Sequence, residues 1–584
     1  MASLVSGLDN ISITNNKNIG ENSHAQHAWT HANFEHDLVQ LYFQLVRIPK
    51  HSLEKIKSVS KKYSLLVSSA IQNSNEVQIN YCMSLLFQTR DICGGKGEYS
   101  LFYNLLTAWE SSWEAYKHKL SPPLKLCFTV ENTDFDKPYG SWKDVKYIVA
   151  HWQKHYAISK DDLVSTWRQY PILAFIIDLA VKQFISDKTS DSPSLVSRWL
   201  PREKSSFGWQ ASIYAELFTV YSECAPPARG VIAQENEWTN SQKRGFMRNY
   251  RKGLASLNRR LGTIQINQAG KNWRNIDFEK QGTSLTMQRQ KAAFMCRGKN
   301  AAAVNDQDRI ECKNNYLKYL ENCKSGKTRM KSKRVSLGEM VKDACLNQTT
   351  TVQEYLDSIN IAWRDHDTPT QQFKDCIAMV DTSASMTWDN CPFYDAIGIG
   401  LKIAECSTLG KRIMTFSSIP TWTNLEGKDT LVDMVVEVGK GNVGMNTDIY
   451  KALNLIATAC LEQDLAPSVV EDLCLVILSD MQIDSADKNW NSLDQNLEIL
   501  FHDTGLKTSH KTPYSPPTIV YWNMRNTNGF PCSTVRNNVI MVSGYSVDVL
   551  KSVFLKGPKA LKDMKPWDAL ALTLQANRYS WFWN

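Results

Sequence analysis

The stretch that decides the fold of the C-terminal part is CIAMVDTSAS, residues 376–385. Its first five residues form an uninterrupted apolar run, which is typical of a strand buried on both faces of a parallel sheet. Asp381 ends that run, and residues 392–404 (PFYDAIGIGLKIA) follow with apolar residues at helical spacing. A strand, a loop and a helix in this order indicate a doubly wound parallel sheet, in which ligands bind beyond the carboxyl ends of the strands.

Two later segments bring further oxygen ligands to similar positions. LCLVIL (473–478) is a second buried-strand candidate and is followed by Ser479 and Asp480. GKGNVGMNT (439–447) is a flexible loop before a helix expected over 449–461. Two carboxylates and three hydroxyls on separate loops suit Mg²⁺ or another divalent cation, and do not suit zinc or copper. Because such a site leaves coordination positions open, a protein partner can offer it an Asp or Glu carboxylate. The candidate ligands are Asp381, Ser383, Ser385, Thr447 and Asp480.

Together these segments resemble the metal-ion-dependent adhesion site of von Willebrand factor A domains, with its Asp-x-Ser-x-Ser motif, later loop Thr and later strand-end Asp. The resemblance implies that Ser383 and Ser385 contact the metal directly. It also implies that Thr447 and the two Asp residues complete the shell, directly or through water. Ala384 departs from the family at a position where glycine is common.

Enzyme classes fit the same residues less well. An aspartyl-phosphate phosphatase needs a second Asp two residues after Asp381, where Ser383 stands instead. A serine hydrolase needs Gly-x-Ser-x-Gly and a partner His, and GGKGE (94–98) lacks the Gly-Lys-Ser/Thr ending of a phosphate-binding loop. We therefore expect no enzymatic activity, and keep a metal-dependent enzyme as an alternative.

The chain has 584 residues, too many for a single core, so several domains are expected. Residues 1–33 are rich in Asn, Ser and His and indicate a loose tail, which makes a metal site at His24, His27 and His31 the less favoured reading. From residue 34 to about 370 apolar residues recur at helical spacing without a strict period, which predicts an array of helix pairs. Alternating strands and helices over 371–584 complete an α + α/β fold class.

Composition and cysteine content predict an intracellular protein. It is 43% hydrophobic and 22% charged, close to an ordinary globular protein, and no apolar run is long enough to span a bilayer. The N-terminus lacks the pattern of a signal peptide. The 14 cysteines include no Cys-x-x-Cys pair, which indicates reduced thiols and predicts an intracellular, cytoplasmic protein with no membrane contact.

Positive charge is concentrated in one region. Residues 241–345 hold 24 Lys and Arg against 8 Asp and Glu, a net +16 in a chain whose total is +8. Such a stretch indicates a polyanion partner and favours nucleic acid, with basic side chains on phosphates and Trp273 stacking on bases. A solvated helix face is the alternative interpretation. The candidate RNA contacts are Arg251, Lys252, Arg259, Arg260, Lys271, Trp273, Arg274, Arg289 and Lys291.

The helical part carries a second resemblance, in TRDICGGKGE (89–98), YGSWKD (139–144), WLPRE (199–203) and YRKGLASLNRRL (250–261). With the metal-site segments, these blocks resemble an uncharacterised family of helical-repeat plus A-domain proteins of plants, fungi and giant viruses. Cys93 departs from that family, which usually has a basic residue there. The family is distantly similar to the Ro (TROVE) ribonucleoprotein autoantigen, whose ring of HEAT-like helical repeats carries an A domain and binds RNA.

These observations lead to three hypotheses. The first is a non-enzymatic RNA-binding scaffold whose Mg²⁺-dependent A-like domain binds an acidic ligand. The second is a protein–protein adaptor, or a virion or virus-factory component, without RNA binding. The third is a metal-dependent enzyme. The resemblance to viral proteins adds the virion as a possible location, and the sequence does not predict the oligomeric state.

Overall fold

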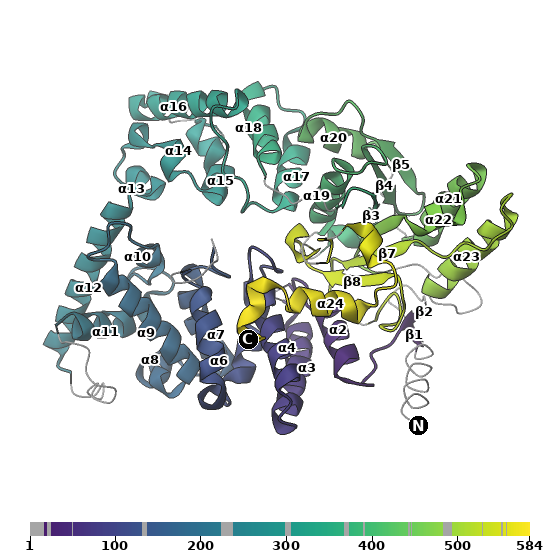
Figure 1. Cartoon of the computed structure of the whole chain (residues 1–584). Helices are drawn as coiled ribbons and strands as arrows, with labels where there is room; N and C mark the ends of the chain where they lie inside the picture. The colour runs from purple at the N-terminus through teal and green to yellow at the C-terminus, as the bar shows by residue number, and fades with distance from the viewer. Residues whose placement is uncertain are drawn as a thin grey trace.

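The computed structural model describes residues 17–19, 25–49, 51–130, 137–223, 238–297, 305–366, 373–388, 392–441, 444, 447–482, 493–527, 529–550, 553–555 and 557–583. An N-terminal series of helices leads into a C-terminal mixed sheet flanked by helices (Figure 1), which confirms the predicted α + α/β fold class. The boundary predicted near residue 370 lies outside the described residues.

The sheet has six strands in the order β5-β4-β3-β6-β7-β8. All neighbours are parallel except the edge strand β5, which pairs antiparallel with β4. The chain goes from β3 to β4 on one side and then returns to β6 on the other side of β3. The connections therefore reverse direction between β3 and β6, and this switch point is where ligands bind in such sheets. The strands are β3 (Cys376–Asp381), β4 (Arg412–Phe416), β5 (Thr421–Asn424), β6 (Cys474–Ser479), β7 (Thr518–Asn523) and β8 (Val539–Ser543).

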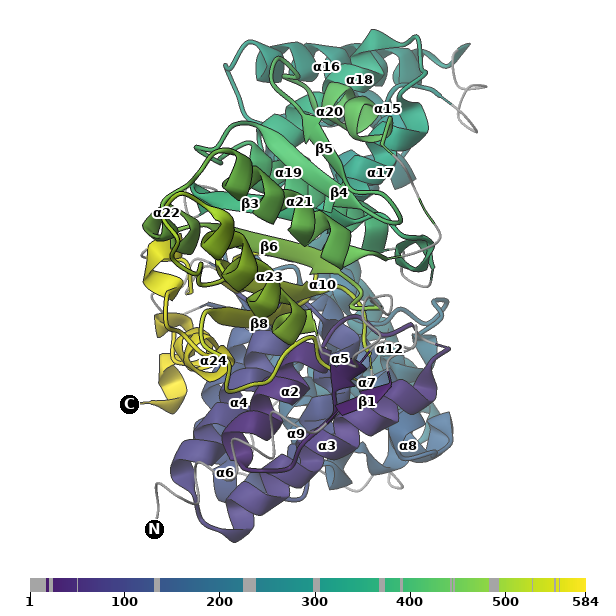
Figure 2. The ribbon, with the colours of Figure 1, turned by 90° about the vertical axis from the view of Figure 1, so that its right-hand side faces the viewer.

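Helices cover both faces of the sheet, which explains why β6, β7 and β8 are buried along their whole length. Three helices lie in front of the sheet in Figure 2, on the side turned away from the N-terminal helices. They are α21 (Ile449–Glu462), α22 (Pro467–Glu471) and α23 (Leu493–Lys507). The opposite face receives α19 (Pro392–Ala404), which packs on β3 and against α17. Two further helices of this part are α20 (Leu431–Val438) and α24 (Pro566–Leu574).

The N-terminal helices form two bodies. The first shares one hydrophobic core with the sheet, and the second has a smaller core of its own that includes Phe278, Phe294 and Tyr316. Gly262 joins them in a left-handed conformation at φ +52°, which glycine adopts without strain. The first body comprises α2 (Phe34–Gln44), α3 (Leu53–Gln72), α4 (Glu76–Arg90), α5 (Tyr99–Leu106), α6 (Trp113–Leu126), α7 (Lys143–His155), α8 (Lys160–Thr166), α9 (Pro171–Ser186), α10 (Val196–Trp199), α11 (Ala211–Glu223) and α12 (Asn240–Leu261). The second comprises α13 (Ile264–Ala269), α14 (Phe278–Gln281), α15 (Ser284–Phe294), α16 (Gln307–Lys324) and α18 (Gln353–Arg364), which contributes to both cores. The buried apolar residues of α17 (Leu337–Asn347) belong to the large core.

The chain closes into a ring because the sheet contacts both ends of the helical series (Figure 1). At one end α17 packs on α19, and at the other α2 packs on β8. The Asn523 side chain donates to the carbonyl of Phe43 at 2.9 Å, and Ser543 Oγ donates to the carbonyl of Tyr42 at 2.7 Å. A C-terminal 3₁₀ helix, η11 (Asn577–Phe582), packs on α4. The last strand of the sheet therefore shares its core with the first helix of the described ring.

Residues 25–33, the described part of the predicted loose tail next to α2, pair with the sheet part through His27. Strand β2 (Ala25–His27) pairs with β1 (Lys17–Ile19), and His27 exchanges two backbone hydrogen bonds of 3.0 Å with Phe530. Polar composition did not reveal this pairing, since its partner lies some 500 residues away. His24 lies outside the described residues. None of the described helices combines the length and apolar character needed to cross a membrane.

Candidate metal centre and nucleic-acid interface

The loop after β3 folds around the carboxylate of Asp381, which is completely buried. The backbone N–H of Ser383 donates to Asp381 Oδ1 at 2.9 Å, and Ser479 Oγ at the end of β6 donates to Asp381 Oδ2 at 2.6 Å. The hydroxyl oxygens of Ser383 and Ser385 lie 3.0 Å apart. The switch point thus brings the ends of β3 and β6 together, with a carboxylate and three hydroxyls within one small volume.

The loop that carries Thr447 lies against the loop after β3. Gly444 and Ser383 form a parallel bridge, in which the N–H of Ala384 donates to the carbonyl of Gly444 at 3.1 Å. A Cβ at Gly444 would lie 2.7 Å from two serine hydroxyls after β4, so only glycine allows this close approach. Thr447 itself is 1% exposed. Asn446, quoted with the same motif, lies outside the described residues.

Asp480 completes the group, immediately after β6. The N–H of Gln482 donates to its Oδ1 at 3.2 Å, and Arg525 Nη1 donates to its Oδ2 at 3.3 Å. Burial, followed by the neighbouring Asp480, raises the pKa of Asp381 to about 7. Burial also raises the pKa of Asp480, although Arg525 and Ser385 act in the opposite direction. Two buried carboxylates that repel each other are a feature that a bound cation would stabilise.

The donor set fits a hard divalent cation. All five predicted ligands contribute oxygen atoms, as Mg²⁺ requires. Within the described ranges no three His, Cys, Asp or Glu side chains cluster in the manner of a zinc or copper site. The residues present could therefore hold Mg²⁺ through Asp381, Ser383, Ser385, Thr447 and Asp480, and the bound ion would act as an electrophilic anchor for an anionic oxygen.

Sequence reasoning missed the positive charges beside this centre. Arg525 follows β7, and it lines one recess together with Arg47, from the connection between α2 and α3, and Lys55, from the first turn of α3. Lys55 Nζ donates to the carbonyl of Asn526 at 3.3 Å, and Arg47 pairs with Glu98 at 2.9 Å. No local motif marks these residues, because only ring closure brings residues 47 and 55 to the edge of the sheet.

Four of the predicted RNA contacts lie on α12. The buried face of this helix includes Tyr250 and Leu254, whereas Lys252 and Arg259 are exposed. Arg251 forms an exposed ion pair with Glu203 at 2.9 Å. Arg260 instead hydrogen-bonds to the backbone. Its guanidinium donates to the carbonyls of Asp187 at 3.1 Å and Lys188 at 2.8 Å, and also to that of Ser190. Arg260 therefore closes the C-terminal end of α9 while still carrying its charge.

The other predicted contacts lie beyond Gly262, in the second helical body. Lys271 and Arg274 are exposed, and Arg274 lies 3.9 Å from both Asp308 and Glu311. The Arg309 guanidinium covers the Trp273 ring at 3.6 Å, so one face of the predicted stacking residue is occupied. Arg289 is exposed and pairs with Glu339 at 3.3 Å. The nine residues therefore do not form a single cluster.

The prediction for Lys291 is wrong. Its side chain is buried and forms an ion pair with Asp343, which ties α15 to α17. A buried cation that is already neutralised is not available to a phosphate. Charge density along the sequence could not separate this lysine from its exposed neighbours, because its partner lies 52 residues away.

Comparisons with known proteins place the chain beside a viral relative. Residues 375–572 match the model of a domain of unknown function, DUF7788. Over 488 residues the chain is 26% identical to "Uncharacterized protein L728" of Acanthamoeba polyphaga mimivirus, covering 81% of this chain and 76% of the viral protein. No solved structure matches the chain. The similarity to the viral protein thus extends well beyond the sheet into the helical ring.

Proposed function

We propose that this chain is a non-enzymatic scaffold that binds Mg²⁺ at the switch point of its sheet and, through the metal, a carboxylate of a protein partner, while its basic helices bind RNA. The observation that carries the metal part is the convergence of Asp381 and Asp480, both buried, with the hydroxyls of the β3 loop. The resemblance to von Willebrand factor A domains, stated above from the motifs, agrees with this arrangement.

The charge of the centre favours an anionic ligand. Ser383, Ser385 and Thr447 supply neutral oxygens, so a divalent ion there retains affinity for a further anion. Arg525, Arg47 and Lys55 line the recess beside the centre, and Lys55, which donates to a neutral carbonyl, adds positive potential there. An Asp or Glu side chain approaching this edge would meet both the metal and these cations.

The metal part is tested on the full chain by following the thermal midpoint during titration with Mg²⁺. An ion that binds only the folded state stabilises it by about 2.7 kcal/mol at a concentration of 100 Kd. We expect Mg²⁺ to raise the midpoint of the parent protein, and Asp381→Asn and Ser383→Ala to remove the rise. Asp472→Asn is the matched control, because Asp472 lies just before β6, at the opposite end of that strand from Asp480. A parent midpoint that is the same in chelator and in millimolar Mg²⁺ overturns the metal part.

The RNA part rests on the exposed positive residues of α12, Lys252 and Arg259 among them, and on the net +16 of residues 241–345. Binding through phosphates releases counterions, so the affinity should fall steeply with salt. Gel shifts with single-stranded and hairpin RNA at low and moderate salt test this directly. A protein free of nucleic acid that shifts neither RNA supports the alternative, an adaptor whose basic surface contacts an acidic protein. We further propose a cytoplasmic location, or a virion location if the chain is viral.

A further inference from the structure

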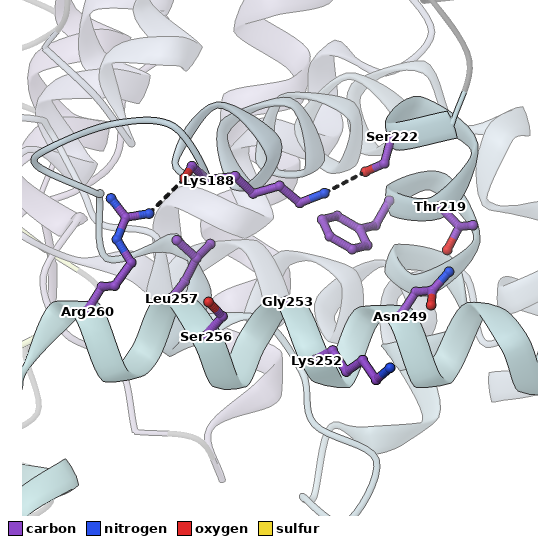
Figure 3. Close-up of a pocket in the computed structure, with 10 residues that line it drawn as sticks. Lys188, Thr219, Ser222, Asn249, Lys252, Gly253, Ser256, Leu257 and Arg260 are labelled. Atoms are coloured by element: carbon purple, nitrogen blue, oxygen red, sulfur yellow. Dashed lines mark hydrogen bonds between the residues drawn. The ribbon is translucent and has the colours of Figure 1, made fainter.

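A pocket of about 380 Å³ lies between the C-terminal end of α9, helix α11 and helix α12, far from the metal centre along the chain (Figure 3). Its size is within the range of sites for small ligands. Lys188 comes from the end of α9, and Phe218 and Ser222 come from α11. One face of α12 supplies the remaining wall, at the helical spacing of Asn249, Lys252, Gly253, Ser256, Leu257 and Arg260.

A glycine of α12 lets α11 approach closely at the floor of this pocket. Gly253 has no side chain, and a Cβ there would lie 2.9 Å from the ring of Phe218, so glycine permits the close packing of α11 on α12. Phe218 is nearly buried and forms an apolar floor. Lys188 Nζ lies 4.3 Å from the centre of that ring and donates to Ser222 Oγ at 3.0 Å, as Figure 3 shows. The lysine, although exposed, is therefore held at the pocket by Ser222 and the Phe218 ring.

The pocket is positively charged. Lys188, Lys252 and Arg260 all line it, and no carboxylate does. Among the residues that the structure describes, none of these three cations forms an ion pair. Arg260 donates to the backbone carbonyls of Asp187, Lys188 and Ser190, which are neutral, so its guanidinium keeps its full charge. Three positive charges around one cavity, with no counter-charge in its walls, give a strong local potential for an anion.

We infer that this pocket binds a phosphate monoester. Such a group carries about −1.5 to −2 charge at neutral pH and three acceptor oxygens, whereas a carboxylate or an internal phosphodiester carries only about −1. Lysine and arginine are the usual partners of phosphate oxygens, and the hydroxyls of Ser222 and Ser256 add neutral donors. The ester could be a free nucleotide-sized molecule or the terminal phosphate of an RNA. The site is independent of the metal centre, and it shares Lys252 and Arg260 with the proposed RNA contact.

The test compares two RNAs of one sequence, with a 5′-phosphate or a 5′-hydroxyl, by fluorescence anisotropy on the full chain. A nucleoside 5′-monophosphate, inorganic phosphate and a glutamate-rich peptide serve as competitors. We expect the phosphorylated RNA or the free monophosphate to bind at least about tenfold more tightly than its unphosphorylated counterpart, as one charge-assisted hydrogen bond provides. The glutamate-rich peptide should compete poorly.

Three variants separate the pocket from general charge effects. Lys252→Met and Lys188→Met should each reduce phosphate-dependent binding about tenfold. Ser256→Phe should reduce it as well, since it fills the cavity without changing its charge. Lys243→Met is the matched control, because Lys243 is an exposed lysine of the same helix that does not line the pocket. Unchanged circular dichroism in each variant establishes that α12 is intact.

The outcomes distinguish this inference from the proposed function. If both RNAs bind equally and the free monophosphate does not bind, the pocket inference is overturned while RNA binding stands. Binding of the monophosphate without either RNA supports a small-molecule ligand and overturns RNA binding. Full binding by Ser256→Phe, or stronger competition by the peptide than by phosphate, overturns the pocket inference in either case.

Discussion

The guanidinium of Arg525 is a fixed positive charge beside two buried carboxylates that we propose to be metal ligands. It donates to Asp480 at 3.3 Å, and its side chain is only 18% exposed. Without a metal, Arg525 partly compensates the negative charge of Asp381 and Asp480. With a metal bound, it repels the ion and competes for one carboxylate oxygen. One residue therefore has opposite effects on the two states.

We therefore predict that Arg525→Met lowers the stability of the metal-free protein but raises its affinity for Mg²⁺. In chelator the variant should unfold at a lower temperature than the parent, because two buried carboxylates lose their fixed cation. In Mg²⁺ it should show a larger rise, with an affinity for Mg²⁺ about tenfold higher, since a nearby positive charge is gone. Scanning calorimetry across a Mg²⁺ titration measures both effects. An identical Mg²⁺ response in parent and variant contradicts the prediction.

Single residues also show what the sequence could and could not predict. Asp381, Ser383 and Asp480 follow apolar strands directly, so local patterning predicted their positions at strand ends, and the structure places them together. Arg525 carries no local signal, since its role arises only when β7 lies beside β6. The same dependence on distant partners misled the prediction for Lys291.

At the scale of elements, neighbouring arginines at the end of α12 have different roles. Both are exposed, but Arg260 also donates to three carbonyls at and after the end of α9. Helix periodicity predicted the existence of α12 and its buried face. It did not predict this capping, because the acceptors belong to a turn about 70 residues earlier in the chain.

We expect Arg260→Met to lower the free energy of unfolding by roughly 1 kcal/mol, since three carbonyls lose a charged donor and the hydrogen bond to that of Asp187 is half-buried. Arg259→Met should change it by less than about 0.5 kcal/mol, as is usual for exposed sites. Both variants remove one positive charge, so any loss of RNA binding through long-range attraction should be similar. Urea unfolding and salt-dependent binding separate the two effects. Equal stability of the two variants contradicts the assigned role of Arg260.

The start of α9 gives a pH-dependent prediction. The N–H of Ile172 donates to Glu110 at 3.4 Å, and burial raises the pKa of Glu110 to about 7. A folded-state pKa above the unfolded value means that stability is fully present below about pH 4.5 and is lost as the pH rises through 7. Glu110→Gln should therefore match the parent at pH 4 and exceed it at pH 8 by roughly 2 kcal/mol.

Scanning calorimetry at several pH values checks this prediction. Glu114→Gln is the control, because Glu114 is exposed at the start of α6 and its side chain faces solvent. A constant difference between Glu110→Gln and the parent across the pH range would contradict the assignment.

At the scale of the whole molecule, a buried ion pair helps to hold the ring closed. Arg578 in η11 donates to Asp91 after α4, with an Nη2 to Oδ1 distance of 2.7 Å, and Tyr579 donates to the same carboxylate at 3.0 Å. Asp91 is completely buried. This contact links the C-terminal segment to α4, which sequence patterning did not predict.

Arg578→Met should lower the free energy of unfolding by about 3–5 kcal/mol, because it leaves a buried carboxylate without its partner. It should also increase hydrogen exchange in α4 and in residues 577–583. Lys559→Met is the matched control, since its ion pair with Asp472 is exposed and such pairs contribute about 0–1 kcal/mol. Hydrogen exchange by mass spectrometry measures both variants. Protection of α4 that is unchanged in Arg578→Met contradicts the role of this contact.

The sequence predicted the fold class but not the hydrophobic core that the helical part and the sheet share. Periodicity distinguished helical from α/β segments correctly, because each is a local property. It suggested separate domains over 34–370 and 371–584, yet the largest core includes residues of both, among them Leu41, Leu86 and Val542. Long-range packing of this kind has no signature in local patterning, and it is the reason that the experiments above use the full chain.

The packing of α2 on β8 has a consequence for co-translational folding. Seven consecutive residues of α2, Leu38–Gln44, are buried, and part of their covering is β8, about 500 residues later. At ordinary rates of translation the first helix waits roughly half a minute to two minutes for that strand to emerge. During this interval its apolar surface has no native cover from the sheet, so nascent chains should depend on chaperones until synthesis is nearly complete.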